Sequence, residues 1–286
     1  APAGWGKTTL LSTWYNEHRS TTAIAWITLD RDDNDPLEFW HNVITALQIV
    51  QPGVATNPFT PGQQVDDALL RTLLGSLAHL PADTVLILDD YQNIVAQAIH
   101  QTLTFLLERL PQRLHLIIAS RSDPPLPLTR LRVQGTALEL RSNDLRFTSQ
   151  EVQTFLEKRV GDLITQKDCL YLEEQTEGWA AGLHLATLSI HSHKDSSEAI
   201  ASFSGNNRYI TDYFTEEIIL QQPEEVQHFL IRTSILACMH GSLCNALLER
   251  DDSQEMLERL EHLNLFVFAQ DDERCRYRYH RLFKQV

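Results

Sequence analysis

The chain has 286 residues, 43% of them hydrophobic, so it can form two or more packed domains and disorder is not expected. Its formal net charge of -14 argues against a nucleic-acid surface, because phosphate backbones attract clustered Lys and Arg. The four cysteines form no C-x-x-C pair, which favours a reducing cytoplasm, and no long apolar run predicts a membrane span.

The chain begins with a phosphate-binding loop that fits G-x-x-x-x-G-K-[ST] except at Ala1, which replaces the first glycine. Glycines let the backbone N–H groups curl around a phosphate, Lys7 adds a positive charge, and the Thr8 hydroxyl can bind Mg2+. Such a loop normally follows a buried strand, so we expect a first strand to be missing before Ala1 and the site to be weaker for it. The loop residues predicted to bind nucleotide are Ala3, Gly4, Trp5, Gly6, Lys7, Thr8 and Thr9.

Apolar runs alternate with amphipathic segments as far as residue 141. Asp35, followed by Pro36, has the pattern of a helix N-cap, and residues 51–64 have the composition of a surface loop. This alternation predicts an α/β fold, a parallel sheet with helices on both faces and ligands at the carboxyl ends of its strands. The predicted helices are 8–18, 36–50, 65–79 and 98–110, and the predicted strands are 23–29, 84–90, 114–119 and 137–140.

The pattern changes near residue 142, after which helix follows helix. Thr148 and Glu151 have the spacing of a capping box, and three acids at 271–273 indicate a hairpin near the end of the chain. These patterns predict an ATPase core at 1–141, a helical domain at 142–222 and a winged helix at 223–286. The predicted helices are 149–160, 165–176, 179–192, 208–221, 223–233, 242–250 and 253–264, with a loop at 193–207 and strands at 265–269 and 275–279.

Two acids end the predicted strand at 84–90. In phosphoryl-transfer sites, the loop hydroxyl and an acid at this position hold one Mg2+, which predicts a shared metal site for Thr8 and Asp89. The alternative is that Asp89 and Asp90 merely end a strand in a solvated turn. Asp90 is predicted either to accept a proton from an attacking water or to orient Asp89.

Arg121 directly follows the strand predicted at 114–119. At this edge of the sheet, it is expected to contact a γ-phosphate in a charge-assisted, bidentate manner, or else to pair with Asp123 at the surface. The five tryptophans are expected to pack in the core rather than to stack on a base, because most lie among apolar residues at helix or strand spacing.

These motifs resemble the signal-transduction ATPases with numerous domains, and specifically the MalT-like branch of large ATP-binding LuxR-type transcription regulators. The resemblance covers essentially the whole chain. Its later segments are the more specific ones, because they join a nucleotide fold to a helical domain and a winged helix. The segments that carry it are 1–11, 86–91, 119–124, 138–148, 178–186 and 277–283.

The resemblance implies roles for individual residues. Lys7 and Thr8 would bind phosphate and metal, Asp89 would hold Mg2+, and Arg121 would act as a sensor of the γ-phosphate. Gly182 lies in a segment that packs on the adenine side in this family, although His184 replaces the usual proline there. His280 matches a winged-helix histidine that contacts the β-phosphate of ADP, and its alternative is a wing residue that faces solvent or core.

The function implied is a cytoplasmic ATP/ADP switch, closed with ADP and open with ATP, that is at most a slow regulatory ATPase. ATP would allow self-association, while an inducer and DNA would bind only through domains outside these residues. One alternative is an ATPase module of the same class whose effector does not bind DNA, such as a kinase or scaffold. A metabolic phosphotransferase would use the same loop and Asp89 but would need a second substrate pocket.

Overall fold

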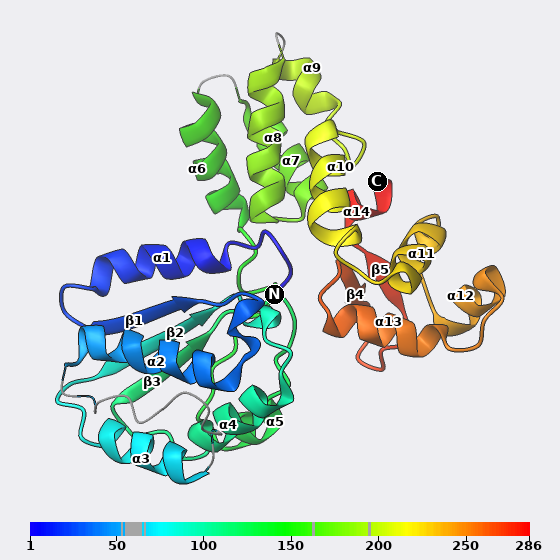
Figure 1. The fold of residues 1–286 in the computed structure, drawn as a ribbon. Helices are drawn as coiled ribbons and strands as arrows, with labels where there is room; N and C mark the ends of the chain where they lie inside the picture. Colours follow the sequence, from blue (N-terminus) through cyan, green and yellow to red (C-terminus); the bar gives the residue numbers. More distant parts are fainter. Residues whose placement is uncertain (53, 55–64, 66, 162–163, 194–195) are drawn as a thin grey trace. The chain divides into compact units, whose positions relative to one another are not determined.

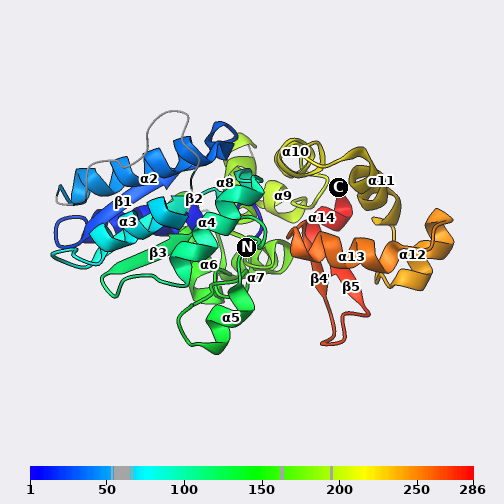
Figure 2. The ribbon, with the colours of Figure 1, turned by 60° about the horizontal axis from the view of Figure 1, so that its bottom comes forward.

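The computed structural model describes residues 1–52, 54, 65, 67–161, 164–193 and 196–286. These residues form two compact units, one of Lys7–Glu139 and one of Ala1–Gly6 with Leu140–Val286. Figures 1 and 2 show the elements of each unit. The predicted division into three domains stays a prediction.

The first unit is built on a three-stranded parallel sheet in the order β1 (Ala23–Thr28), β2 (Thr84–Asp89) and β3 (Leu114–Ile118). All six residues of the central strand β2 are buried, as expected for an apolar strand with neighbours on both sides and helices on both faces. The strands are paired so that Thr28 lies beside Asp89, which places the acid at the carboxyl edge of the sheet.

Helices cover both faces of this sheet (Figure 1). α1 (Lys7–His18) packs on one face, where Ile24, Val85 and Ile87 form a small core with half-buried side chains of the helix. The larger core on the other face is completed by α2 (Pro36–Val50), α3 (Asp67–Leu77) and α4 (Gln97–Leu107). The predicted α/β fold is therefore confirmed.

The strand predicted at 137–140 is wrong. These residues form no strand, the Leu138 side chain is 88% exposed, and Glu139 is paired with Arg132. A four-residue alternation of apolar and polar side chains is too short to form a strand unless a core or a neighbouring strand covers its apolar side chains. A short helix that we did not predict, α5 (Leu128–Val133), precedes it. The loop predicted at 51–64 lies mostly outside the described residues.

The second unit begins with the helices α6 (Ser149–Val160), α7 (Gln166–Thr176) and α8 (Ala180–Ser192). The capping box of Thr148 and Glu151 is confirmed at the start of α6. The loop predicted at 193–207 is wrong in part, because it contains α9 (Ser196–Ala201). The helix predicted at 208–221 is confirmed as α10 (Arg208–Phe214), which continues as a π-helical turn over Thr215–Ile219.

A winged-helix order closes the chain. The antiparallel hairpin is confirmed, because Val267 pairs with Tyr279 and Ala269 with Tyr277. Its strands are shorter than predicted. Figure 2 shows the hairpin beside α13. The elements of this part are α11 (Glu224–Thr233), α12 (Gly241–Leu248), α13 (Ser253–His262), β4 (Val267–Ala269), β5 (Tyr277–Tyr279) and α14 (Arg281–Gln285).

One hydrophobic core runs through the second unit from α6 to α14 and includes Ala3 and Trp5. Trp5, Trp40 and Trp179 are buried, while Trp14 on α1 and Trp26 on β1 are partly buried against the small core of the first unit. The core packing expected for the tryptophans is therefore confirmed. Among the described residues, no helix combines the length and the apolar character that a membrane crossing requires.

Candidate nucleotide-binding site

Thr8 and Asp89 come together where the first turn of α1 meets the end of β2. The Thr8 hydroxyl donates to Asp89 Oδ1 over 3.2 Å. Asp89 is only 1% exposed, and its other oxygen, Oδ2, has no hydrogen-bond partner among the described residues. Burial raises the pKa of Asp89, and the Thr8 hydrogen bond opposes this shift. A buried carboxylate oxygen without a donor is a suitable ligand for a cation.

The oxygen donors fit the chemistry of Mg2+. A hydroxyl and a carboxylate are hard ligands, and Mg2+ is usually held by one or two carboxylates together with phosphate oxygens and waters. The described residues contain no cluster of three or more His, Cys, Asp or Glu placed to hold a metal ion. Thr8 and Asp89 therefore suit a cation that arrives with a phosphate better than a cation bound by protein alone.

Lys7 shares one electrostatic environment with Arg121, Asp89 and Asp90. Burial and, to a smaller extent, the Arg121 charge lower the pKa of Lys7 to about 8, while Asp90 and Asp89 act in the opposite direction. A polyphosphate anion would offset the repulsion that Lys7 experiences from Arg121. The structure thus brings together four of the residues predicted from the sequence.

Asp90 and Arg121 are connected through Gln92, which the sequence analysis did not identify. Asp90 has a left-handed backbone (φ 57°), and its N–H donates to Asp89 Oδ1 over 3.1 Å. The Gln92 amide donates to Asp90 Oδ1 over 2.9 Å and accepts from the Arg121 N–H over 2.9 Å. This arrangement supports an orienting role for Asp90, while its role as a base stays a prediction.

The phosphate-binding loop itself shows the backbone that its glycines allow. Gly4 and Gly6 have φ angles of 72° and 79°, a region that other residues adopt only with strain. Ala3 and Trp5 are buried in the core of the second unit, and Thr9 is exposed in the first turn of α1. Their predicted contacts with nucleotide stay predictions.

Gly182 has a packing role that explains its residue type. A Cβ atom at this position would lie 2.5 Å from Cε3 of the buried Trp179 ring and 3.3 Å from Cγ2 of Thr176. The missing side chain therefore lets the indole fold back against α8. The adenine contact predicted for Gly182 stays a prediction.

We expect Gly182→Ala to destabilise the second unit by about 1–3 kcal/mol, because neither the indole nor the helix can move away without repacking. Gly75→Ala is the control, since that glycine lies inside α3, where an added Cβ atom would meet none of the described residues within 4 Å. The control should be neutral or slightly stabilising. Urea unfolding followed by circular dichroism measures both, and equal stability of Gly182→Ala and the unsubstituted chain would contradict the packing role.

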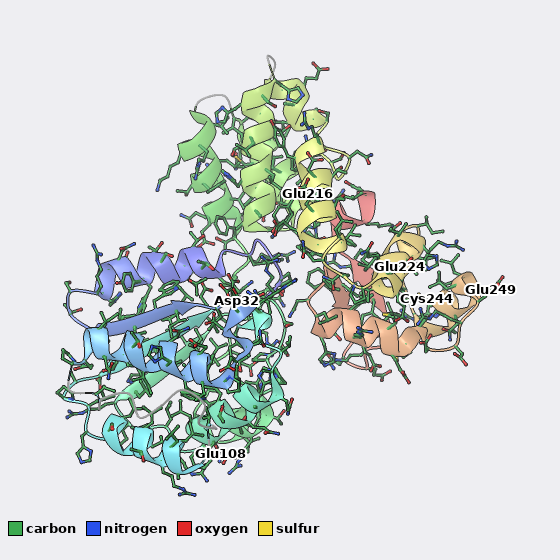
Figure 3. The ribbon with its side chains drawn as sticks, viewed as in Figure 1. Asp32, Glu108, Glu216, Glu224, Cys244 and Glu249 are labelled. Carbon is green, nitrogen blue, oxygen red and sulfur yellow. The ribbon has the colours of Figure 1, made fainter. Side chains whose placement is uncertain are left out.

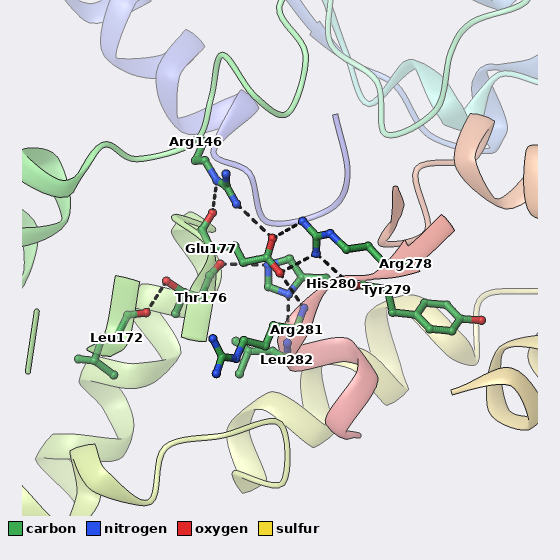
Figure 4. A network of polar contacts seen from close by, with 9 residues as sticks. All are labelled: Arg146, Leu172, Thr176, Glu177, Arg278, Tyr279, His280, Arg281 and Leu282. Atoms are coloured by element: carbon green, nitrogen blue, oxygen red, sulfur yellow. Dashed lines mark hydrogen bonds and ion pairs between the residues drawn. The ribbon is translucent and has the colours of Figure 1, made fainter. Parts of the chain in front are cut away.

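His280 is fully buried, so a wing residue that faces solvent is wrong, whereas the other form of that alternative, a wing residue that faces the core, fits the structure. Its Nδ1 accepts from the Leu282 N–H over 3.3 Å, so Nε2 carries the proton and donates to the Thr176 carbonyl over 3.0 Å (Figure 4). Burial lowers the pKa of His280 to about 4, against the opposing charge of Glu177. The histidine is therefore neutral, and both of its nitrogens are engaged. The contact predicted between His280 and the β-phosphate stays a prediction.

Glu177, a second residue that the sequence analysis did not identify, is the centre of a charged network in the second unit (Figure 4). Its carboxylate accepts two bonds from Arg278, at 2.7 and 2.9 Å, and one from the Arg281 N–H at 2.9 Å. Arg146 also pairs with it, at 3.1 Å. Burial would raise the pKa of Glu177, but Arg278, His280 and the Arg281 N–H lower it.

The net negative charge is spread over exposed helices and turns of both units rather than concentrated at these sites. Figure 3 labels five exposed acids that illustrate this distribution: Asp32, Glu108, Glu216, Glu224 and Glu249.

Residues 215–286 match the family described as the MalT winged helix domain. Over 288 residues, the chain is 33% identical to the HTH-type transcriptional regulator MalT of Yersinia enterocolitica, covering 99% of this chain and 32% of that protein. The chain is MalT-like.

A second MalT, from Vibrio cholerae, is 30% identical over 291 residues, with 100% of this chain and 32% of that protein covered. The chain thus spans about a third of the length of these MalT relatives. The Walker-type ATPase PABY2304 of Pyrococcus abyssi shares the fold, with a TM-score of 0.64 at 13% identity over 99% of this chain and 88% of its own. The chain therefore shares the fold of a Walker-type ATPase, as the sequence predicted.

Proposed function

We propose that this MalT-like chain is the nucleotide-operated switch of a transcription regulator. The observation that carries the proposal is the meeting of Lys7, Thr8, Asp89 and Arg121 at the carboxyl edge of the sheet, where P-loop folds bind phosphate. Lys7 binds the phosphates of ATP or ADP, and Arg121 contacts the γ-phosphate, which only ATP has. The chain is at most a slow regulatory ATPase.

Mg2+ is the cation that fits beside the phosphates. The Thr8 hydroxyl and Asp89 would hold it, and it would neutralise phosphate charge when bound. Asp90 holds Asp89 in place through its backbone N–H, and Gln92 fixes the distance between Asp90 and the Arg121 backbone. These residues therefore support a site in which the protein contributes few ligands and the nucleotide contributes the rest.

The switch itself follows from what His280 can donate. Its single Nε2 proton is used by Thr176 in this structure, so a bond from His280 to the β-phosphate of ADP would replace that bond. Driving a two-state equilibrium from 1:99 to 99:1 takes about 5.5 kcal/mol of differential binding. Charge-assisted hydrogen bonds contribute about 1.5–3 kcal/mol each, so the Arg121 contact, together with the difference between the two bonds of His280, supplies part of this difference.

ADP therefore favours a closed state and ATP an open state that associates with further copies. An inducer supplies the remaining free energy through a sensor domain, and DNA is bound through another domain, both outside these residues. The winged-helix match supports this assignment to a regulator over one to a metabolic phosphotransferase.

Asp89→Asn tests the metal-dependent part of the proposal. We expect the variant to lose most of the gain in ATP affinity that Mg2+ gives over EDTA, about tenfold, because an amide oxygen carries no charge for the cation. Asp83→Asn is the matched control, since Asp83 is exposed just before the opposite end of β2. Isothermal titration calorimetry measures the affinities. The same Mg2+ dependence in Asp89→Asn and the control would contradict the assignment.

A further inference from the structure

The first half of the phosphate-binding loop is held by the start of α8. The Trp179 indole N–H donates to the Ala3 carbonyl over 3.1 Å, and the Ala181 N–H donates to the Gly4 carbonyl over 2.9 Å. Two successive loop carbonyls thus point at donors on one helix. A carbonyl oxygen turned toward a phosphate would repel it, so committing both oxygens elsewhere favours anion binding by the N–H groups of the loop.

The loop also fits closely against the same helix. A Cβ atom on Gly4 would lie 2.6 Å from Ala181 Cβ and 2.8 Å from both Trp179 Nε1 and the Tyr213 hydroxyl. The left-handed φ of Gly4 adds a second reason for glycine at this position. The contact between loop and helix is therefore specific to the backbone conformation that the phosphate-binding motif requires.

Trp179 connects this contact to the winged helix. Its ring is fully buried, stacks on Phe214 at 5.1 Å, and meets Phe266 and His280 edge-on at 5.2 and 5.7 Å. Its backbone N–H and His280 Nε2 donate to the same carbonyl, that of Thr176, at 2.9 and 3.0 Å. A shift of the loop that moves the indole must therefore disturb the surroundings of His280.

We propose that Trp179 is a positioning residue that sets the conformation of the phosphate-binding loop and links it to His280. The inference rests on the proposed function, because it assumes that the loop binds nucleotide. It deepens that function by naming the side chain through which the loop and the winged-helix histidine are coupled. Trp179 touches no phosphate itself and acts through the Ala3 carbonyl.

The test is Trp179→3-benzothienylalanine, which keeps the shape of the ring and removes only the N–H donor. We expect ADP affinity, measured by calorimetry below the melting temperature, to fall about three- to tenfold, which is the effect of one lost hydrogen bond. We also expect faster amide hydrogen exchange at residues 4–8 without nucleotide. The matched control is the same replacement at Trp40, whose ring is also fully buried and whose N–H donates to Thr102 over 3.0 Å in the other unit.

Unchanged affinity and loop exchange in the Trp179 variant would overturn the inference. An equal loss in the Trp40 variant would also overturn it, because the effect would then come from general destabilisation. Failure of the proposed function has a separate signature, which is that Lys7→Ala binds ADP as well as the unsubstituted chain. In that case the exchange of residues 4–8 still decides whether Trp179 positions the loop.

Discussion

Lys7→Ala is expected to weaken both ADP and ATP binding about a hundredfold. Lys7 lies where burial and Arg121 disfavour its positive charge, with a pKa of about 8 in the absence of phosphate. A bound phosphate removes this conflict, because its charge stabilises both cations at once. Alanine removes the charge-assisted bond between Lys7 and the phosphate. It also removes one of the two cations that offset the repulsion of the phosphate by Asp89 and Asp90.

Calorimetric titration of ADP and ATP measures this effect, with circular dichroism to show that the variant is folded. Lys158→Ala is the matched control, since Lys158 is exposed on α6. The control should bind both nucleotides as the unsubstituted chain does. If the Lys7 and Lys158 variants had the same affinities, the phosphate-binding role of the loop would be wrong.

Glu177→Gln is expected to lower the free energy of unfolding of the second unit by about 2 kcal/mol. The substitution keeps the size of the side chain and the same left-handed backbone (φ 49°), so it isolates the loss of charge. Arg278 would keep only part of its bidentate partner, and Arg146 would lose its counter-charge. A partly buried cation without its acid is costly.

Glu174→Gln provides the comparison. Glu174 lies on α7, which ends one residue before Glu177, and pairs with Arg281 at 2.6 Å, but 66% of its side chain and 40% of the arginine's are exposed. Exposed pairs contribute about 0–1 kcal/mol, so this variant should unfold almost as the unsubstituted chain does. Urea titrations of the three proteins decide the matter. Similar losses for Glu174→Gln and Glu177→Gln would show that Glu177 is an ordinary surface acid.

Local patterns predicted most of the elements. The Asp35 side chain caps α2, accepting from two backbone N–H groups, and the Thr148 and Glu151 capping box opens α6, both as expected from short-range chemistry. The errors occur where burial decides the outcome. Residues 137–140 have a strand-like alternation, yet no neighbouring strand or core among the described residues covers their leucines.

The sequence predicted those site residues that belong to short local motifs. Lys7, Thr8 and Asp89 belong to two short patterns whose meeting follows from a parallel sheet, and their proximity is confirmed. Gln92 and Trp179 were missed as site residues because the partners that connect them to the site, Arg121 and Ala3, are distant in sequence. Trp179 contacts a carbonyl 176 residues away, and nothing in the local sequence of a buried tryptophan indicates such a partner.

Amide hydrogen exchange around His280 tests the nucleotide switch most directly. The Leu282 N–H donates to His280 Nδ1, and His280 Nε2 donates to Thr176, so a histidine that turns to ADP changes the protection of Leu282. Exchange is measured at residues 277–283 with saturating ADP and with a non-hydrolysable ATP analogue and Mg2+. The account predicts different protection of this segment in the two states. Identical protection with both nucleotides bound would contradict it.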